Sequence, residues 1–414
     1  MNPQFSVYLD LVRLLASFTV FFSHLIIVGN PLLWRFKVFP GHLGVIVFFV
    51  LSGYVIAYVV FERKEHCSKF IVSRFTRIYS VVIPAMVITY LSFWFVQQNN
   101  PILLEVINDN QEVTLTQFFS VLFMLHQSWQ QVHFLTNNPI WSIAFEMFYY
   151  IAFAVLIYTK GIKRITLFCC VVLVMGPNIF LYFPLWLLGV CSFCLATRCK
   201  TSLYLSLLLS FLPIFGIVYL FSSGVELWFH EISNAFVNNR LDELLNAQSQ
   251  NLLHDYACAF LLSVHFVGMF NLLKYKSVFS KWLGKKIKVG AEMTFALYLL
   301  HLPLLYVTSA IFRPSSSSVV HALISLLLLP IVIFFLSKFI EARKAHYYSF
   351  FSYYLPQGII WTIRLLLVNQ NPHHLLAFDC CCCCCCLCYL DFHLLLTFVF
   401  ILLCICICMC VVSF

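Results

Sequence analysis

The first apolar segment of the chain, residues 7–28, carries three side chains that can do chemistry: Asp10, Arg13 and His24. An ionisable group in a membrane helix costs about 2.5–3.5 kcal/mol for Arg near the middle and usually marks a functional interior face. A helix would place Arg13 and His24 on one face roughly 16 Å apart, and Asp10 within pairing distance of Arg13. Headgroup anchoring also explains Asp10 and Arg13, and packing against a neighbouring helix also explains His24.

Two further clusters lie in the second and third apolar segments. Ser52 and Gly53 end a glycine-containing run that begins at Gly41. Glycine lets membrane helices approach closely, and serine can hydrogen bond between them. These residues fit a functional site and also a simple helix-packing interface. Arg74 and Arg77 are spaced one turn apart before the third segment. Their guanidinium forks suit phosphate oxygens, although ordinary basic loop charge explains the same pair.

Two later apolar segments also contain polar groups. Trp141, Glu146 and Tyr149 belong to the segment 139–158, in which Glu146 lies about one and a half turns from the start. A lone carboxylate at that position needs a partner or must stay protonated. His301 lies near the middle of the ninth segment, close to a proline that interrupts the helix and frees a backbone carbonyl.

The elements that position these residues follow from the composition. Of 414 residues, 62% are hydrophobic and only 10% are charged, whereas soluble domains have about 25% charged residues. Apolar runs of about twenty residues recur along the chain. We therefore predict an all-α, polytopic membrane protein that lies in a lipid bilayer. The net charge of +9 does not indicate a nucleic-acid partner, because the location of the charges decides their meaning.

About ten helices are expected to cross the membrane. The fifth and sixth are short and are broken near Gly176-Pro177 and Pro184. A further apolar segment at the C-terminus, residues 387–412, is hydrophobic enough to insert as well. The ten segments are roughly 7–28, 42–61, 78–97, 139–158, 165–178, 182–197, 203–222, 254–273, 290–312 and 319–340.

Lysine and arginine fall mainly in alternate loops. Nineteen lie on one side of these helices, here called the basic side, and four lie on the opposite side. This asymmetry predicts that the basic side and the N-terminus are cytoplasmic. His24 and Glu146 then both lie in the outer half of the membrane, opposite the basic side, and we expect them at matching depth in the bilayer. The basic-side residues are Arg63, Lys64, Lys69, Arg74, Arg77, Lys160, Lys163, Arg164, Arg198, Lys200, Lys274, Lys276, Lys281, Lys285, Lys286, Lys288, Lys338, Arg343 and Lys344; the others are Arg35, Lys37, Arg240 and Arg313.

The last part of the chain has a different composition. Twelve of the nineteen cysteines follow residue 379, and seven of them form an unbroken run from Cys380 to Cys386. Neighbouring cysteines in a run cannot all converge on one ion, so we expect low-complexity sequence and no metal site. We therefore divide the chain into a membrane domain, residues 1–345, and an apolar, Cys-rich tail, residues 346–414, that begins with an aromatic interfacial helix.

In sequence order, these motifs resemble the membrane acyltransferase-3 family, from about residue 5 to 345. Many members have an acidic residue where Ile46 stands, so a carboxylate role at that position does not carry over. The matching motifs are Asp10-x-x-Arg13 with His24, the block from Gly44-Val45 to Ser52-Gly53, Arg74-x-x-Arg77-Ile78, Trp141-Ser142-x-x-x-Glu146-x-x-Tyr149, Tyr298-x-x-His301-x-Pro303 and Phe339-Ile340-Glu341.

The resemblance implies an O-acyltransferase in a bacterial plasma membrane that modifies polysaccharide. The donor would be acyl-CoA, usually acetyl-CoA, and the acceptor a cell-surface or lipid-linked carbohydrate. Arg74 and Arg77 would hold the CoA phosphates, with Arg13 as a deeper partner. His24 would act as general base or transient acyl carrier, since imidazole exchanges protons near neutral pH, and Glu146 would orient or charge a partner.

The remaining polar residues fill out the expected site. Ser52 and Gly53 are assigned to the donor-binding side. The expected polar or structural residues of the site are Asp10, Trp141, Tyr149 and His301.

Two other functions use the same residues. A proton-coupled transporter would need a path of ionisable groups inside the membrane, and His24, His301, Glu146 and Arg13 offer one. We find no clear inverted repeat of broken helices, which many transporters contain. A structural partner in a polysaccharide-export complex would depend on its loops and would not need His24.

Overall fold

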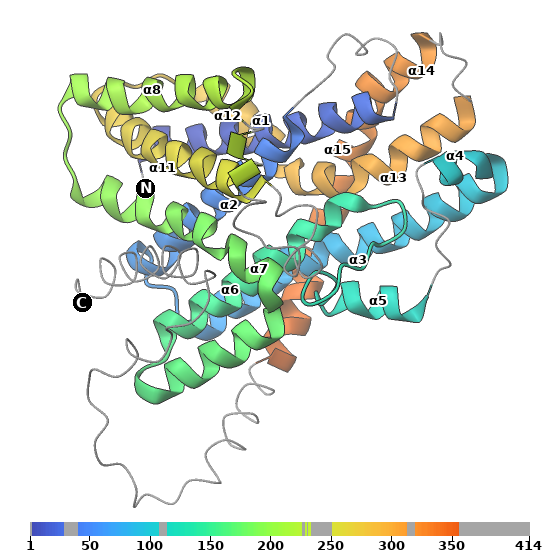
Figure 1. Cartoon of the computed structure of the whole chain (residues 1–414), viewed down its shortest axis with the longest axis horizontal. Coiled ribbons are helices and arrows are strands. Elements are labelled where there is room, and N and C mark those ends of the chain that lie inside the picture. Colours follow the sequence, from blue (N-terminus) through green and yellow to red (C-terminus); the bar gives the residue numbers. More distant parts are fainter. Residues whose placement is uncertain are drawn as a thin grey trace, which may run out of the picture.

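The structure is a computed structural model and describes residues 2–28, 40–106, 114–225, 228–229, 231–232, 251–312 and 319–355. This part of the chain is 87% helical and contains no strand, which confirms the all-α prediction. Nine of its helices are long and apolar enough to cross a membrane (Figure 1). They are α1 (Pro3–Ile27), α2 (Gly41–Ala57, continued by a π-helical turn to Glu62), α3 (Cys67–Asn99), α6 (Trp141–Tyr158), α7 (Gly161–Arg198), α8 (Leu203–Ser222), α11 (Leu252–Tyr275), α13 (Thr294–Phe312) and α14–α15 (Val319–Leu323 and Leu329–Ala342).

Helix α7 takes the place of the fifth and sixth expected spans. It is divided at Gly176, where φ is +74° and ψ is 174°, and Pro177 follows directly. A positive φ favours glycine, and here a Cβ atom would also lie 2.2 Å from the carbonyl oxygen of Ser128. The two arms of α7 therefore run in different directions (Figure 1). One broken helix thus supplies both short segments: the expected break at Gly176-Pro177 is present, whereas the helix continues through Pro184.

Helix α2 lies at the centre of the bundle because glycines let its neighbours approach. A Cβ atom on Gly44 would lie 2.7 Å from the Ala16 carbonyl oxygen in α1. On another face, Gly53 and Gly189 form a reciprocal contact, in which each would place a Cβ atom 2.0 Å from a carbonyl oxygen of the other helix. These backbone contacts fix α2 between α1 and α7.

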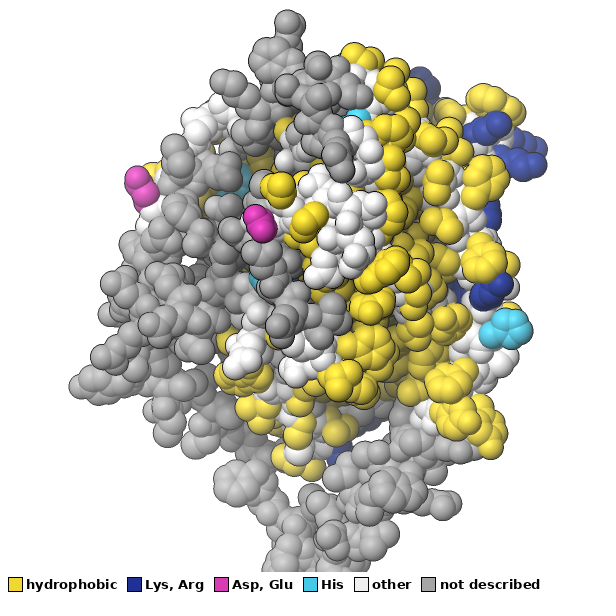
Figure 2. All heavy atoms as spheres, turned by 90° about the vertical axis from the view of Figure 1, so that its right-hand side faces the viewer, with side chains coloured by type: hydrophobic (Ala, Val, Ile, Leu, Met, Phe, Trp, Pro, Cys, Tyr) yellow, Lys and Arg dark blue, Asp and Glu magenta, His cyan; other side chains and the backbone are white. Residues whose placement is uncertain are grey.

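One face of the described chain has the polarity that a membrane requires. Figure 2 shows hydrophobic side chains gathered in a broad band over one face, with Lys and Arg grouped toward one edge. The N-terminus lies at the basic side, because the Asn2 amide donates to the Leu273 carbonyl and the Gln4 amide to the Phe279 carbonyl, both at 3.0 Å. The short helix α12 (Lys281–Glu292) begins just after this contact.

The chain stays helical from residue 344 to 355. Phe351 packs on Phe75 and Tyr79, with ring centroids 5.8 Å and 5.5 Å apart, so the start of the expected interfacial helix lies against α3. The expected eleventh span and the cysteine run lie outside the described residues.

We expect Gly189→Ala to destabilise the protein, because the new Cβ atom would stand 2.0 Å from the Val50 carbonyl oxygen. Overpacking of this kind costs roughly 1–3 kcal/mol. The temperature at which detergent-purified protein loses its monodisperse chromatographic peak should therefore fall. Gly290→Ala is the matched control, since its Cβ atom would meet only the flexible end of Leu14, at 3.1 Å. Equal thermal stability of the two variants would contradict the close backbone contact of Gly189 with α2.

Candidate functional site

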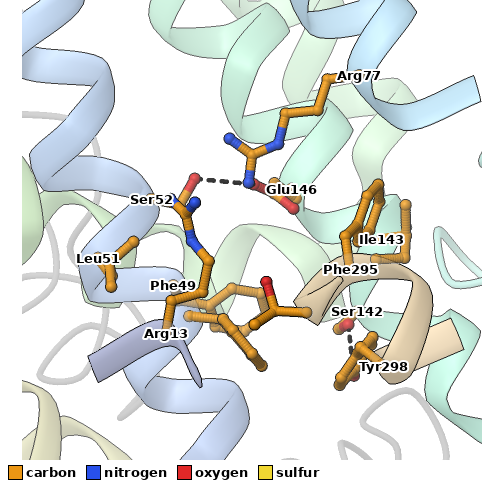
Figure 3. A pocket seen from close by; sticks show the side chains of 12 residues that line it. Arg13, Phe49, Leu51, Ser52, Arg77, Ser142, Ile143, Glu146, Phe295 and Tyr298 are labelled. Carbon is orange, nitrogen blue, oxygen red and sulfur yellow. Dashed lines mark hydrogen bonds and ion pairs between the residues drawn. The ribbon is translucent and has the colours of Figure 1, made fainter. Parts of the chain in front are cut away.

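A small cavity of about 40 Å³ lies between α1, α2, α3, α6 and α13 (Figure 3). Its walls are mainly aromatic and aliphatic, with a few polar groups that converge on the centre. The lining residues are Arg13, Phe48, Phe49, Leu51, Ser52, Arg77, Ser142, Ile143, Glu146, Thr294, Phe295 and Tyr298. This volume holds a water-sized group, so larger occupants require the lining side chains to move.

The charged groups of this cavity are centred on Glu146. One of its carboxylate oxygens accepts hydrogen bonds from the Ser52 hydroxyl at 3.0 Å and from the Tyr150 hydroxyl. An Arg77 nitrogen lies 4.0 Å from the same oxygen. The guanidinium groups of Arg13 and Arg77 both point into the cavity (Figure 3). Two cations thus face one carboxylate, so the cavity lining carries an excess of positive charge.

Ser52 connects this carboxylate to the packing of α2. The indole nitrogen of Trp186 donates to the Ser52 hydroxyl at 3.2 Å, and the Tyr150 hydroxyl lies 3.1 Å away. The neighbouring Gly53 points about 100° away around the helix and contacts the Trp186 backbone. Of the two expected residues, Ser52 lines the cavity and Gly53 lies in the α2–α7 interface.

A second pocket, of about 230 Å³, adjoins this cavity on the basic side. The two share Arg13, Arg77, Thr294 and Phe295, so the two guanidinium groups stand at their boundary. Here this space is called the basic-side pocket. Its other lining residues are Ser80, Val81, Ala291, Glu292, Ala296, Ser337, Ile340, Glu341 and Lys344.

The two arginines of the expected phosphate clamp have different partners. Arg77 lines both spaces, whereas Arg74 lines neither of them. A guanidinium nitrogen of Arg74 lies 3.9 Å from a carboxylate oxygen of Glu65. The guanidinium carbon lies 6.0 Å from the centroid of the Tyr150 ring. Asp10 lies 3.9 Å from Arg13 but outside the cavity wall.

Two separate polar contacts lie along α13 between the cavity and the opposite side. The hydroxyl groups of Ser142 and Tyr298 are 2.7 Å apart. One turn further along α13, Nε2 of the fully buried His301 lies 3.1 Å from Nδ1 of His24. The two expected histidines therefore meet, although neither lines the central cavity.

The histidine pair and Glu146 lie at different depths. His301 is three residues beyond Tyr298 toward the opposite side, and Glu146 is four residues beyond Ser142 toward the basic side. At the helical rise, these steps separate the two levels by about 10 Å. The expectation of matching depth for His24 and Glu146 is therefore wrong.

The error lies in where α6 begins. Just before α6, the fully buried Asn137 donates to Thr89 Oγ1 in mid-α3 at 2.8 Å and to the Leu299 carbonyl in α13 at 3.0 Å. The helix thus starts inside the bundle, and counting turns from the membrane surface placed Glu146 too near the opposite side.

The hydrogen bonds of the histidine pair assign its tautomers. Nδ1 of His301 lies 2.8 Å from the Leu297 carbonyl, so it carries the proton and Nε2 accepts. His24 Nδ1 then carries a proton as well, since it faces His301 Nε2 and, at 2.9 Å, the Val20 carbonyl. The lone pair of His24 is left on Nε2, where it can accept a proton from a substrate.

The other expected residues serve as packing around the cavity. Trp141 stacks on His42 with ring centroids 6.3 Å apart, and the Tyr149 hydroxyl donates to the Ile179 carbonyl at 3.2 Å. The sequence reasoning did not assign site roles to Ser142 and Tyr150. Both are four residues from Glu146, and this i, i+4 spacing was the signal for a shared helix face.

Metal chemistry has no obvious ligand set in this part of the chain. Across the described residues, no group of three or more His, Cys, Asp or Glu side chains could hold an ion.

Comparison with known proteins agrees with the motif order. A family model described as Acyltransferase domain (Acyl_transf_3) matches residues 6–338, which are 333 of the 414 residues and include every residue that lines the cavity. No curated protein and no solved structure matches the chain. The chain therefore belongs to the acyltransferase-3 family and is a multi-pass membrane acyltransferase.

Proposed function

We propose that the protein is an O-acyltransferase that moves an acyl group, acetyl in the simplest case, from acyl-CoA to a hydroxyl of a cell-surface or lipid-linked carbohydrate. The observation that carries this proposal is the line of polar groups through the bundle. It runs from the basic-side pocket past Arg13 and Arg77, and on to the histidine pair. The family membership favours acyl transfer over solute transport for these groups.

The donor enters from the basic side, which we assign to the cytoplasm of a bacterial plasma membrane because of its lysines and arginines. Arg77 and Arg13 stand where the pocket narrows and hold the CoA diphosphate, since guanidinium groups bind phosphate oxygens in pairs. The pantetheine arm then crosses the central cavity. It spans the roughly 16 Å between the levels of Arg13 and His24.

Transfer takes place beside the histidine pair. The acceptor hydroxyl oxygen bonds to the thioester carbonyl carbon, and the carbon–sulfur bond breaks. His24 Nε2 takes the hydroxyl proton and returns it to the departing CoA thiolate, so no proton is gained or lost. His301 holds His24 in the tautomer that this step needs, and general base catalysis of this kind contributes roughly 10²–10⁴-fold.

Glu146 has a positioning role in this scheme. Its hydrogen bonds to Ser52 and Tyr150 fix the carboxylate, and the carboxylate balances the charge of the nearby Arg77. Without it, two guanidinium groups would repel each other in the empty cavity. The site would then be ordered only when phosphate is bound.

We expect His24→Ala to lower acyl transfer by roughly 10²–10⁴-fold, because the general base is lost. His301→Ala should lower it less and shift the pH profile of transfer, since the histidine loses its orienting partner. The amount of alkali-labile acyl ester on surface glycans of expressing cells is determined by mass spectrometry, and the pH profile is measured as transfer of labelled acyl groups by purified protein. Membrane levels of each variant are followed by immunoblot.

The control for this pair is His346→Ala, which changes an exposed histidine far along the chain from either motif. It should leave glycan acylation unchanged. Full acylation by the His24→Ala variant would contradict the catalytic assignment, and so would an unaltered pH profile for His301→Ala.

Arg77→Gln should raise the KM for acyl-CoA at least about tenfold, because a charge-assisted phosphate contact is lost. Arg74→Gln should have a smaller effect, since Arg74 pairs with Glu65 and lines neither space. Arg77→Lys should recover part of the loss. Transfer of labelled acyl groups by purified protein provides the measurement, and an equal effect of the two glutamine variants would contradict the division of roles.

A further inference from the structure

The opening of the basic-side pocket contains two lysine–glutamate pairs that the proposed mechanism does not use. Lys344 lies 2.8 Å from Glu341, and Lys338 lies 2.5 Å from Glu292. Both glutamates and Lys344 line the pocket. The second pair connects α15 to the end of α12, so it crosses between two walls of the pocket.

These pairs are exposed enough to exchange partners. The two lysine side chains are each 42% exposed, and those of Glu292 and Glu341 are 44% and 53% exposed. Exposed ion pairs contribute little to protein stability. A phosphate group offers a lysine more negative charge and more acceptor oxygens than a carboxylate does, so an arriving phosphate can take the lysine from its glutamate.

Cationic side chains lie at two depths in the basic-side pocket. Arg13 and Arg77 stand at the inner end of the pocket, where it meets the central cavity, and Lys344 lines the same pocket beyond the end of α15. CoA carries its negative charge at two separate places, the diphosphate and the 3′-phosphate of the ribose. If the diphosphate lies between the arginines, the 3′-phosphate stays behind it, toward the opening.

We propose that Lys344, with Lys338 beside it, binds the 3′-phosphate of the donor CoA in place of Glu341 and Glu292. This assignment rests on the proposed function, because it requires that CoA enters the basic-side pocket. It makes the lysines specificity residues that distinguish CoA from donors without the 3′-phosphate. The two glutamates hold the lysines in position while the pocket is empty.

The test is the affinity of purified protein for CoA and for dephospho-CoA, measured by titration calorimetry in nanodiscs, so that no acyl transfer is needed. Wild type should bind CoA about tenfold more tightly than dephospho-CoA. Lys344→Gln should weaken CoA binding several-fold, which removes most but not all of this preference, and leave dephospho-CoA binding unchanged. The Lys338→Gln, Lys344→Gln double variant should abolish the preference.

A variant that binds CoA more tightly distinguishes phosphate binding by Lys344 from a purely structural role of this lysine. Glu341→Gln releases Lys344 and removes a negative charge from the pocket, so it should tighten CoA binding several-fold. Lys286→Gln is the control, because Lys286 is an exposed basic-side lysine that lies over the Trp282 ring and does not line the pocket. It should change neither affinity.

Each contrary result has a distinct meaning. Equal weakening of CoA and dephospho-CoA binding by Lys344→Gln would overturn the assignment, and so would a wild type without preference for CoA. Either result leaves the proposed function standing. A wild type that binds neither compound would overturn the assignment and the proposed donor together.

Discussion

The partly buried carboxylate of Glu146 is the group on which the arrangement of the bundle centre depends. A carboxylate inside a membrane protein is stable only when hydrogen-bond donors and cations replace the lost water. Here Ser52 of α2, Arg77 of α3 and Tyr150 of α6 do so together. These partners come from three helices, so one carboxylate sets the relative position of all three.

Close packing behind α2 makes this polar centre possible. Gly53 and Gly189 bring the backbones of α2 and α7 into contact, and this contact fixes the rotation of α2 about its axis. Ser52, one residue earlier, is then turned toward α6 and its carboxylate. The same α2 rests on α1 through Gly44, so the helix that carries Arg13 and His24 is held at a defined distance. The glycine contacts therefore position the helices whose polar side chains meet in the cavity.

Charged residues of the candidate site could be predicted from sequence because polar groups in apolar segments are rare. Arg13 and Glu146 were identified on that ground and Arg77 from its spacing with Arg74, and the three meet in one cavity. The pairing of His24 with His301 was not predictable in detail, because contacts between helices distant in sequence depend on how the bundle packs. The break of α7 was visible in advance, since Gly176 and Pro177 interrupt any helix.

The difference in depth between Glu146 and His24 was missed because each helix was assumed to start at the membrane surface. Asn137 finds its partners inside the bundle, so α6 begins deeper than its hydropathy indicates. Arg74 and Arg77 looked equivalent as a pair one turn apart. Glu65, which lies before α3, provides Arg74 with a local partner and leaves Arg77 to the cavity.

In the proposed mechanism, the acyl donor spans the bundle from the arginines to the histidine pair. An experimental structure with a non-hydrolysable acyl-CoA analogue tests this most directly. We expect the CoA diphosphate between Arg13 and Arg77 and the acyl carbonyl carbon beside His24 Nε2. A donor bound with its acyl group outside this line of polar groups, or with its phosphates away from both arginines, would contradict it.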